Sequence, residues 1–496
     1  MNRTVLRVFT LATVLALLLP SDSAAVRSDA SSPTSIIDLA ATAVEHDVLL
    51  TWSHLDEGIE RYDVHRSRAP HFEPGDASFV ESVLPEARAM LTYPDTGRAG
   101  TGNYFYTGGS AQAAAGQTIH VDISAAPGGD GSEAHPFQTI QAGIDAAVAD
   151  DVVLVHPGIY DGAVFMKNGV AVIGAELAED VTIRSGQATT VWCADQALLQ
   201  DVTVTSTDPG TGDATIQCRA ARPMFNRISV TDLTGRALVL NDTSDAFIRD
   251  SYFESPFALS GFLIRGGATL WDNLFVGKLE RDSSSDYPGS HLELEGNIIA
   301  GQLRVGVSGF RSDTAGLYNN WLINGTVTFG SIGGTGRALV ANNTRLGKDT
   351  GFSVGQYWSV DFLNNIVGYT GTGISVYSPV AGDRVEHNLF WANTANASGI
   401  PDPVGGAGNI SADPQFSDMD QGDFHLQAGS PAIDAGLDLP EITLDFDLDP
   451  RPCDGDGDGI AHHDIGADEF ITAACREVTP TPTATVTLTP TVEPTA

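Results

Sequence analysis

The sequence is poor in basic residues, and lysine is almost missing. Among 496 residues there are three lysines, Lys167, Lys278 and Lys348, and the formal net charge is −37. A nucleic-acid partner needs a basic footprint for its phosphates, so the composition argues against one. Acidic surfaces are more typical of proteins that stay soluble in a salty, extracellular setting.

Long apolar runs are also missing beyond the N-terminus. The one run, from Val5 to Leu19, follows Arg3 and Arg7 and precedes the small residues Ser23–Ala25. This pattern predicts a secretory signal peptide over residues 1–25, with no membrane span after cleavage. We therefore expect a secreted or cell-surface protein, and we expect it to be a monomer.

The two flanking segments have too few apolar residues to form a core. Residues 26–36 are expected to be a linker, and residues 477–496 alternate proline and threonine. Such an alternation favours an extended, solvated stalk that spaces a protein from a surface. No anchoring signal follows it, so either the stalk is the true end or attachment is by other means.

The middle of the chain repeats. Eight positions recur at intervals of 22 to 25 residues, and most are followed by bulky apolar residues: Asn226, Ser251, Asn273, Asn297, Asn320, Asn343, Asn365 and Asn388. A fixed period in the low twenties is typical of a solenoid.

Two solenoids fit this period, the leucine-rich repeat and the parallel β-helix. The spaced leucines of the former are missing, whereas short Val/Ile/Phe/Thr runs broken by Gly, Asn and Asp predict strands and turns. Coils of a β-helix stack about 4.8 Å apart. The asparagines would then lie in line, bond side chain to side chain and occupy tight left-handed turns.

Residues 37–117 have a different pattern of apolar and turn residues and do not show the repeat. Alternating segments containing Trp52, Tyr62, Tyr93 and Tyr104–Tyr106 are separated by turn residues, which predicts a small β-sandwich. The order "LTW", "YDVHRS", "YPDTG" and "NYFYTGG" resembles a fibronectin type III domain. The resemblance implies a module that binds or spaces rather than catalyses.

The segment that follows predicts the start of the solenoid. Pro136 to Ala147 has the spacing of an amphipathic helix of about ten residues, which would cap the open end, and Val152–Val155 would be the first strand. The stretch "DGSEAHPFQTIQAGIDAA…VVLVHPGIY" resembles the start of right-handed parallel β-helix proteins of the pectate lyase-like superfamily.

A second match lies near the C-terminus. The segments "ADPQFSDMDQGDFHLQAGSPAIDAG" and "DIGADEF" resemble the ending of many secreted bacterial β-helix proteins of unassigned activity. We expect the β-helix with its cap helix over 118–415 and a C-terminal end and cap over 416–476. The fold class is therefore all-β, a right-handed parallel β-helix behind a fibronectin type III-like sandwich.

Activity does not follow from this resemblance, because the fold hosts lyases, hydrolases, esterases and inert surface proteins. The Gly-His-Gly, Arg-Ile-Lys and Asp-Phe-Ile-Phe-Gly motifs of its hydrolase and methylesterase branches are missing. A polysaccharide lyase would need a basic residue near carboxylates that hold Ca²⁺. The best candidates are Arg249, Asp250, Arg265 and Asp272, of which Asp250 and Asp272 fall one coil apart; a solvated turn pair is the alternative.

An acidic loop follows the last repeat. Asp454, Asp456 and Asp458 alternate with glycines, and Ile460 could offer its carbonyl, as in the first half of an EF-hand loop. Asp464 stands one place before the expected closing ligand. These five residues predict a structural calcium site, with a solvated acidic turn as the alternative; a transition metal at His462 and His463 is the weaker interpretation.

Four cysteines suit an oxidising compartment and allow three pairings. Cys193 and Cys218 are one coil apart, and Cys453 and Cys475 bracket the acidic loop. We expect disulfides 193–218 and 453–475, with four buried thiols as the alternative.

The leading hypothesis is a secreted β-helix protein that binds extracellular polysaccharide, with no activity that the sequence assigns. Alternatives are a calcium-dependent lyase of uronate-containing polymers and a purely structural adhesin or spacer.

Overall fold

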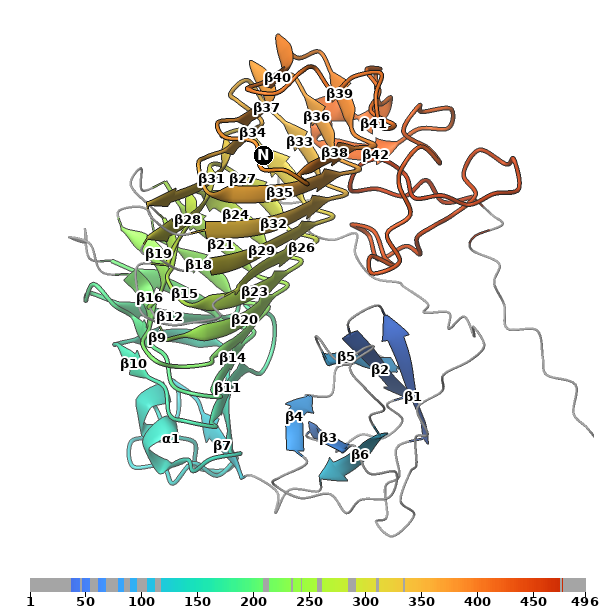
Figure 1. Cartoon of the computed structure of the whole chain (residues 1–496). Coiled ribbons are helices and arrows are strands. Elements are labelled where there is room, and N and C mark those ends of the chain that lie inside the picture. The colour runs from blue at the N-terminus through green and yellow to red at the C-terminus, as the bar shows by residue number, and fades with distance from the viewer. Residues whose placement is uncertain are drawn as a thin grey trace, which may run out of the picture.

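Short apolar runs separated by turns form a solenoid of parallel strands (Figure 1). The computed structural model describes residues 117–472 and Cys475, except for 208–213, 233–234, 242, 257–260, 284–290, 309–311 and 333–334, together with the backbone of six strands between residues 37 and 111. The predicted signal peptide (1–25), linker (26–36) and stalk (477–496) lie outside these residues.

Each full coil contributes one strand to each of three sheets, which we call the first, second and third sheet. The first sheet contains β7 (Thr118–Val121), β8 (Val152–Val155), β11 (Ala171–Gly174), β14 (Leu198–Gln200), β17 (Met224–Asn226), β20 (Asp245–Arg249), β23 (Gly267–Trp271), β26 (His291–Glu295), β29 (Ser312–Tyr318), β32 (Thr335–Ala341), β35 (Trp358–Leu363) and β38 (Arg384–Glu386). The second contains β9 (Gly158–Asp161), β12 (Val181–Ser185), β15 (Thr203–Ser206), β18 (Ser229–Thr231), β21 (Tyr252–Ser255), β24 (Leu274–Gly277), β27 (Ile298–Ala300), β30 (Trp321–Ile323), β33 (Thr344–Leu346), β36 (Ile366–Gly368) and β39 (Leu389–Trp391). The third contains β10 (Val164–Phe165), β13 (Val191–Trp192), β16 (Ala214–Cys218), β19 (Arg236–Leu240), β22 (Phe262–Ile264), β25 (Leu279–Ser283), β28 (Leu303–Ser308), β31 (Val327–Ile332), β34 (Phe352–Val354), β37 (Thr372–Val376) and β40 (Ala395–Ser398).

The sheets wind into a right-handed parallel β-helix of about nine turns, which confirms the predicted solenoid. Alternate side chains point inward and stack on the equivalent residue of the next coil. Phe253 and Phe275 of the second sheet, for example, are fully buried, with ring centroids 5.1 Å apart. Two arginines, Arg281 and Arg345, also take inward positions in the register of apolar neighbours and are fully buried.

The asparagine ladder forms at the turn between the first and second sheets. Asn343 Nδ2 donates to Asn365 Oδ1 (3.0 Å), to Leu317 O and to Ala341 O, and its own Oδ1 accepts from the backbone N–H and the side chain of Asn320. The side-chain bonds link six successive pairs, from Asn273 through Asn409, so the predicted in-line bonding is confirmed.

Two details of the predicted ladder are wrong. Asn226 ends β17 and pairs with Gln200, while Ile228 takes the ladder position and donates its N–H to Ser251 Oγ. The left-handed residue of each turn is the one before the ladder position, such as Asn342 at φ 54°, rather than the ladder asparagine itself. Equal spacing could not show which residue of the turn carries the strain.

The helix α1 (Ile140–Ala146) lies at the N-terminal end of the solenoid, with Thr139 as its N-cap (Figure 1). It is shorter than predicted because the preceding residues pair with β7, where the N–H of Phe137 donates to His120 O. The first parallel strand is β7 rather than Val152–Val155, since β7 pairs with β8.

After β40 the chain turns back along the solenoid. The strands β41 (Phe416–Asp418) and β42 (Asp423–Leu426) flank the 3₁₀ turn Met419–Gln421, and this segment packs on the outer side of the last coils of the second sheet (Figure 1). We call residues 410–472 the C-terminal cap. The ring of Trp321 stacks on Phe446 at 4.0 Å, so burial of apolar surface attaches the cap.

A column of left-handed asparagines also holds the cap. Asn364 accepts from the N–H of Leu437 and donates to its carbonyl oxygen, each at 2.7 Å. One and two coils earlier, Asn342 Nδ2 lies 3.4 Å from His463 Nδ1 and Asn319 Nδ2 donates to Leu444 O. The cap therefore runs across three coils on turn side chains that project from the solenoid.

Both predicted disulfides, Cys193–Cys218 and Cys453–Cys475, are present. In the N-terminal region, β1 (Ile37–Val44), β2 (Asp47–Ser53) and β5 (Met90–Asp95) pair antiparallel, as do β3 (Arg61–Ser67), β4 (Phe79–Val83) and β6 (Phe105–Ala111). The side chains there are outside the description, so the fibronectin type III assignment stays a prediction. Among the described residues, no helix has the length and apolarity needed to cross a membrane.

Asn343→Ala should lower the free energy of unfolding by about 3 kcal/mol, because it leaves several buried backbone groups without a hydrogen-bond partner at once. Asn226→Ala, off the ladder with a single side-chain bond, is the matched control and should cost less than about 1 kcal/mol. Denaturant unfolding of the two variants checks this. Equal losses would mean that the ladder carries no special share of stability.

Candidate functional site

The four residues proposed as weak catalytic candidates occupy two different corners of the coil. Arg249 ends β20 and pairs with Asp250 at 3.0 Å, and Asp250 and Asp272 both occupy the left-handed turn position, one coil apart. Arg265 precedes β23, whereas Asp272 follows it, so the length of a strand separates them. The structure thus brings Asp250 and Asp272 into one column but leaves Arg265 elsewhere.

The acidic loop folds around its own aspartates. Asp454 accepts from the N–H groups of Gly457 and Gly459, and Asp456 and Asp458 each accept from the N–H two residues on. Both oxygens of Asp454 accept one such bond and Asp456 and Asp458 each use Oδ1, and a carboxylate oxygen with a single hydrogen bond keeps a lone pair for a cation.

Asp434, which sequence reasoning missed, joins this loop from more than twenty residues away. Its carboxylate accepts from the N–H groups of Gly455, Asp456 and His462 at 2.8–2.9 Å. One oxygen each of Asp434, Asp454 and Asp456 lie within 4.8 Å of one another, an all-oxygen set of the kind that Ca²⁺ prefers. Asp458 and Ile460 stay predicted ligands.

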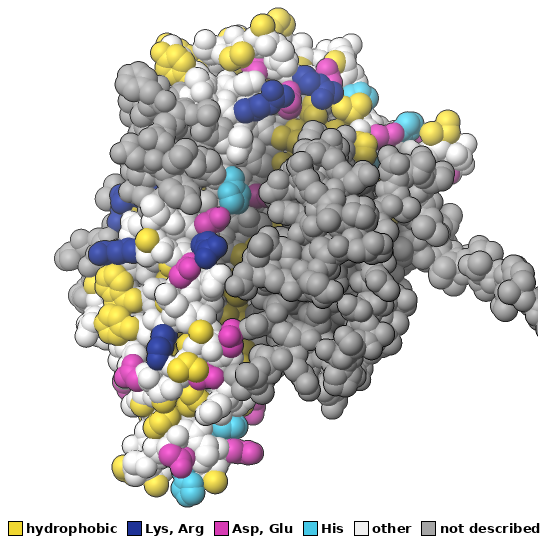
Figure 2. Space-filling model, turned by 60° about the horizontal axis from the view of Figure 1, so that its bottom comes forward, with side chains coloured by type: hydrophobic (Ala, Val, Ile, Leu, Met, Phe, Trp, Pro, Cys, Tyr) yellow, Lys and Arg dark blue, Asp and Glu magenta, His cyan; other side chains and the backbone are white. Residues whose placement is uncertain are grey.

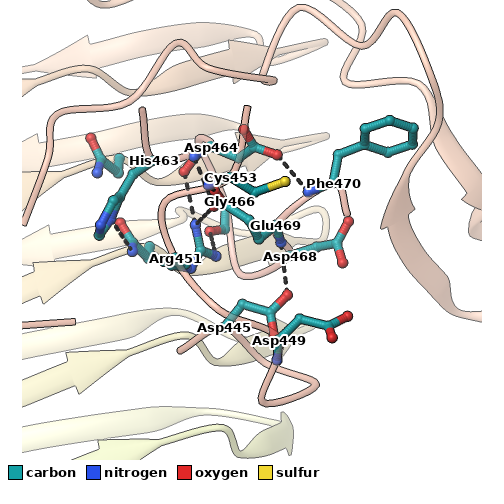
Figure 3. Close-up of polar contacts among 12 residues, drawn as sticks. Asp445, Asp449, Arg451, Cys453, His463, Asp464, Gly466, Asp468, Glu469 and Phe470 are labelled. Carbon is teal, nitrogen blue, oxygen red and sulfur yellow. Dashed lines mark hydrogen bonds and ion pairs between the residues drawn. The ribbon is translucent and has the colours of Figure 1, made fainter. Parts of the chain in front are cut away.

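Asp464 lies in a different place from the loop carboxylates. It is buried and accepts from the N–H groups of Asp434 and Phe470, so its oxygens serve the backbone (Figure 3). It therefore supports the loop through the backbone of Asp434. The Asp445-Phe446-Asp447-Leu448-Asp449 segment is a turn rather than a strand, since Asp445 accepts from the N–H groups of Asp447 and Asp449.

Arg451 is the centre of the cap. Its guanidinium is fully buried, pairs with Glu469 at 2.7 Å and donates to the carbonyl oxygens of Asp464 and Gly466 (Figure 3). Burial raises the pKa of Asp464 and of Glu469, and the charge of Glu469 raises the pKa of Asp464 further, while Arg451 acts to lower both. Breaking such a buried pair typically costs about 3–5 kcal/mol, so this network is structural.

A separate feature lies on the outer face of the third sheet. Phe165 of β10 and Trp192 of β13 occupy the same register position on successive coils, with ring centroids 6.3 Å apart and planes within 2° of parallel. Phe165 is 54% exposed, and the guanidinium of Arg219 lies 5.2 Å from the Trp192 ring centroid. Two parallel, stacked rings with a cation over the Trp192 ring form an aromatic cluster, which we call the platform.

The same register column changes character along the axis. Beyond buried Val239 and Leu263 it reaches Glu280, which pairs with Lys278 and Arg304, and it then continues through Thr328, Ser353, Ser375 and Ser398. Figure 2 shows basic side chains next to acidic ones on the face that it draws. Opposite charges on neighbouring coils form ion pairs, as Arg222 and Asp195 do at 3.0 Å. Sequence reasoning missed the platform because Phe165 and Trp192 are 27 residues apart in segments without a shared motif. Only the strand register of successive coils aligns them.

Comparison with protein-family models and with curated proteins found no match. Among solved structures, the chain is similar to a pectin methylesterase from carrot (11% identity, 61% of this chain and 90% of that chain covered, TM-score 0.29). It is also similar to the catalytic unit of a GH87 α-1,3-glucanase from Streptomyces thermodiastaticus (14%, 76% and 87%, 0.31) and to tailspike protein gp49 of Acinetobacter baumannii bacteriophage Fri1, a capsular polysaccharide depolymerase (11%, 76% and 72%, 0.33). With TM-scores this low, these likenesses support no statement about what the chain binds or does. The fold rests on the strand pairing.

His463 should make the cap sensitive to acid. Burial, helped by the charge of Arg451, lowers the pKa of His463 from 6.5 to about 4. Because the unfolded chain takes up this proton first, stability present at pH 7 is lost as the pH falls from about 6.5 toward 4. Through this group, a change from pH 7 to pH 5 should cost about 2 kcal/mol.

The His463→Gln variant lacks this group, so its free energy of unfolding should fall less than that of the parent protein between pH 7 and pH 5. The difference between the two proteins should therefore be smaller at pH 5 by about 2 kcal/mol, as measured by denaturant unfolding at both pH values. His462→Gln, at an exposed neighbour paired with Asp438, is the control. A deficit that stays constant with pH would contradict a neutral, buried His463.

Proposed function

We propose that this protein is a secreted or surface-attached β-helix that binds a linear polysaccharide along the outer face of the third sheet. The single observation that carries the proposal is the parallel pair of exposed Phe165 and half-buried Trp192. Among the exposed large hydrophobic side chains, Phe165 is one that packs against a second ring, which gives a ligand a larger aromatic surface to contact. The apolar faces of sugar rings stack on such surfaces, while their hydroxyl groups need donors and acceptors.

The repeat of the solenoid suits a polymer. A chain that lies along the axis meets the same lateral position once per coil, about every 4.8 Å. Arg219 supplies donors beside the platform, and Thr328, Ser353 and Ser375 supply hydroxyl groups farther along the same column. The platform would hold sugar faces, and the polar part of the column would hold the hydroxyl and carboxylate groups of units farther along, beyond the three coils in which Gln217, Val239 and Leu263 are buried.

The remaining parts would support this role. Calcium at Asp434, Asp454 and Asp456, with Asp458 and the carbonyl of Ile460 as further ligands, would relieve repulsion in the loop and brace the cap beside disulfide 453–475. The signal peptide, the fibronectin type III-like module and the Pro/Thr stalk would export the β-helix and hold it away from a surface.

Trp192→Ala should weaken binding to the polysaccharide at least tenfold, because it removes the larger ring of the platform. Tyr377→Ala is the matched control: Tyr377 directly follows β37 of the same sheet and is 79% exposed, yet it belongs to no stacked pair among the described residues. Affinity electrophoresis on pectins, alginates and glycosaminoglycans measures both.

Failure of the parent protein to bind any of these polymers would favour the adhesin or spacer alternative. The same panel tests the lyase alternative through the ultraviolet absorbance of unsaturated product. We expect none, and a Ca²⁺-dependent signal that Arg249→Ala or Arg265→Ala abolishes would establish the lyase.

Calcium should raise the thermal unfolding midpoint of the full chain, and EDTA should lower it, because the ion binds the folded loop alone. Asp456→Asn should abolish the calcium-dependent shift. Asp464→Asn is the comparison variant. It should lower the unfolding midpoint both with and without calcium, because Asp464 accepts backbone N–H groups, but calcium should still raise the midpoint. A midpoint that is unchanged by EDTA would exclude structural calcium.

A further inference from the structure

A second group of metal-ligand side chains lies in the cap, away from the acidic loop. His425 of β42, Asp447 of the 445–449 turn and Asp468 each offer one ligand atom, and these atoms lie within 4.8 Å of one another. The three residues come from separate segments that only the folded cap brings together. Unlike the all-oxygen loop, this group includes an imidazole nitrogen.

The imidazole is oriented as a metal ligand is. Nδ1 of His425 lies against the Asp423 carboxylate, and Nε2 faces Asp447 Oδ2 at 2.5 Å. A histidine that binds a metal with one nitrogen usually donates the other N–H to a carboxylate, which fixes the tautomer and the ring. Asp423 supplies that carboxylate here, and Nε2 donates to Asp447 in an ion pair, so a metal would take the place of the Nε2 proton.

Asp468 provides an independent observation. Its side chain is 6% exposed, and Oδ2 accepts the N–H of Leu426 at 2.6 Å. The other oxygen, Oδ1, accepts no hydrogen bond from the residues that the structure describes. Figure 3 shows the Asp468 carboxylate directed away from Arg451, so the central arginine does not satisfy it.

Electrostatics then requires a cation. Asp447 and Asp468 converge in a partly buried site, which is unfavourable unless positive charge lies beside them, and a protonated His425 supplies one such charge through its ion pairs with Asp423 and Asp447. A single proton on Nε2 would serve Asp447 and leave Asp468 Oδ1 without a donor. A divalent ion has coordination positions for all three atoms.

The surroundings hold the three ligands in place. Asp445 accepts the N–H of Asp447 at 2.8 Å, which orients that turn, and the indole of Trp321 meets His425 edge-on at 5.4 Å. A hydrogen-bonded ligand set under an apolar wall is typical of a built metal site. Tetrahedral zinc places its ligand atoms about 3.3 Å apart, so binding needs Nε2 and Oδ2 to separate by less than about 1 Å.

We propose that His425 Nε2, Asp447 and Asp468 bind a divalent transition-metal ion of the Zn²⁺ class, with Asp423 as the positioning residue behind the imidazole. One nitrogen and two carboxylates suit zinc and its neighbours better than they suit calcium. The site joins β42, the 445–449 turn and the last cap segment. It is independent of polysaccharide binding.

Calorimetric titration of the chelator-treated full chain with Zn²⁺, with Ca²⁺ in excess to fill the acidic loop, tests the proposal. We expect one equivalent of Zn²⁺ to bind. His425→Gln should abolish that binding, and Asp423→Asn should weaken it about 10- to 100-fold. His462→Gln, which changes a histidine at the acidic-loop side, should bind like the parent.

Co²⁺ absorption is a second readout, because tetrahedral Co²⁺ gives visible bands that an ion on the surface does not. Loss of the bands in Asp423→Asn and their persistence in His462→Gln would support the site. The proposal is overturned if the parent protein binds no Zn²⁺, or if His425→Gln binds as much as the parent. Circular dichroism of each variant separates loss of binding from loss of folding.

Discussion

The structure depends above all on hydrogen bonding between successive coils, to which the asparagine ladder adds buried side-chain bonds from Asn273 to Asn409. Each strand of the solenoid has partners only in the coils before and after it. At the tight turn between the first and second sheets, the backbone alone cannot satisfy every group. The ladder side chain supplies one acceptor and two donors per coil, as Asn343 does toward Asn320, Leu317 and Ala341. This sets the register, and a slip of one residue would turn the core residues outward.

One consequence of the ladder is a regular column on the outside. The residue before each ladder position is left-handed, and its side chain projects at the same place in every coil. In early coils the column holds charged residues that pair across coils, such as Arg227 with Asp201 at 2.7 Å. In the last coils it holds Asn319, Asn342 and Asn364, which bond the cap. The turn residues of the last coils thereby form the surface that binds the C-terminal cap, which carries both candidate cation sites.

Features that repeat, or that lie close in sequence, were predictable. The strand-and-turn texture predicted the solenoid, the one-coil spacing predicted disulfide 193–218, and the Asp-Gly alternation predicted the acidic loop. Errors arose where spacing is ambiguous by one or two residues. Asn226 has the right interval but ends a strand, so it lies two residues before the ladder position. Asn-Asn pairs at 319–320, 342–343 and 364–365 were a visible signal for the docking column, because one residue of each pair serves the ladder and the other the cap.

The sequence by itself determined the class of fold, its period, its disulfide partners and a loop rich in carboxylates. The fold class, its period and disulfide 193–218 follow from local conformational preference repeated along one axis, and the acidic loop and disulfide 453–475 follow from residues close in sequence. The tertiary structure decided which outward residues meet. Phe165 joins Trp192 through coil register, Asp434 joins Asp454, and His425 joins Asp447 and Asp468 because the cap folds back over three coils. Such meetings depend on contacts between segments distant in sequence, and no local preference of the chain encodes them.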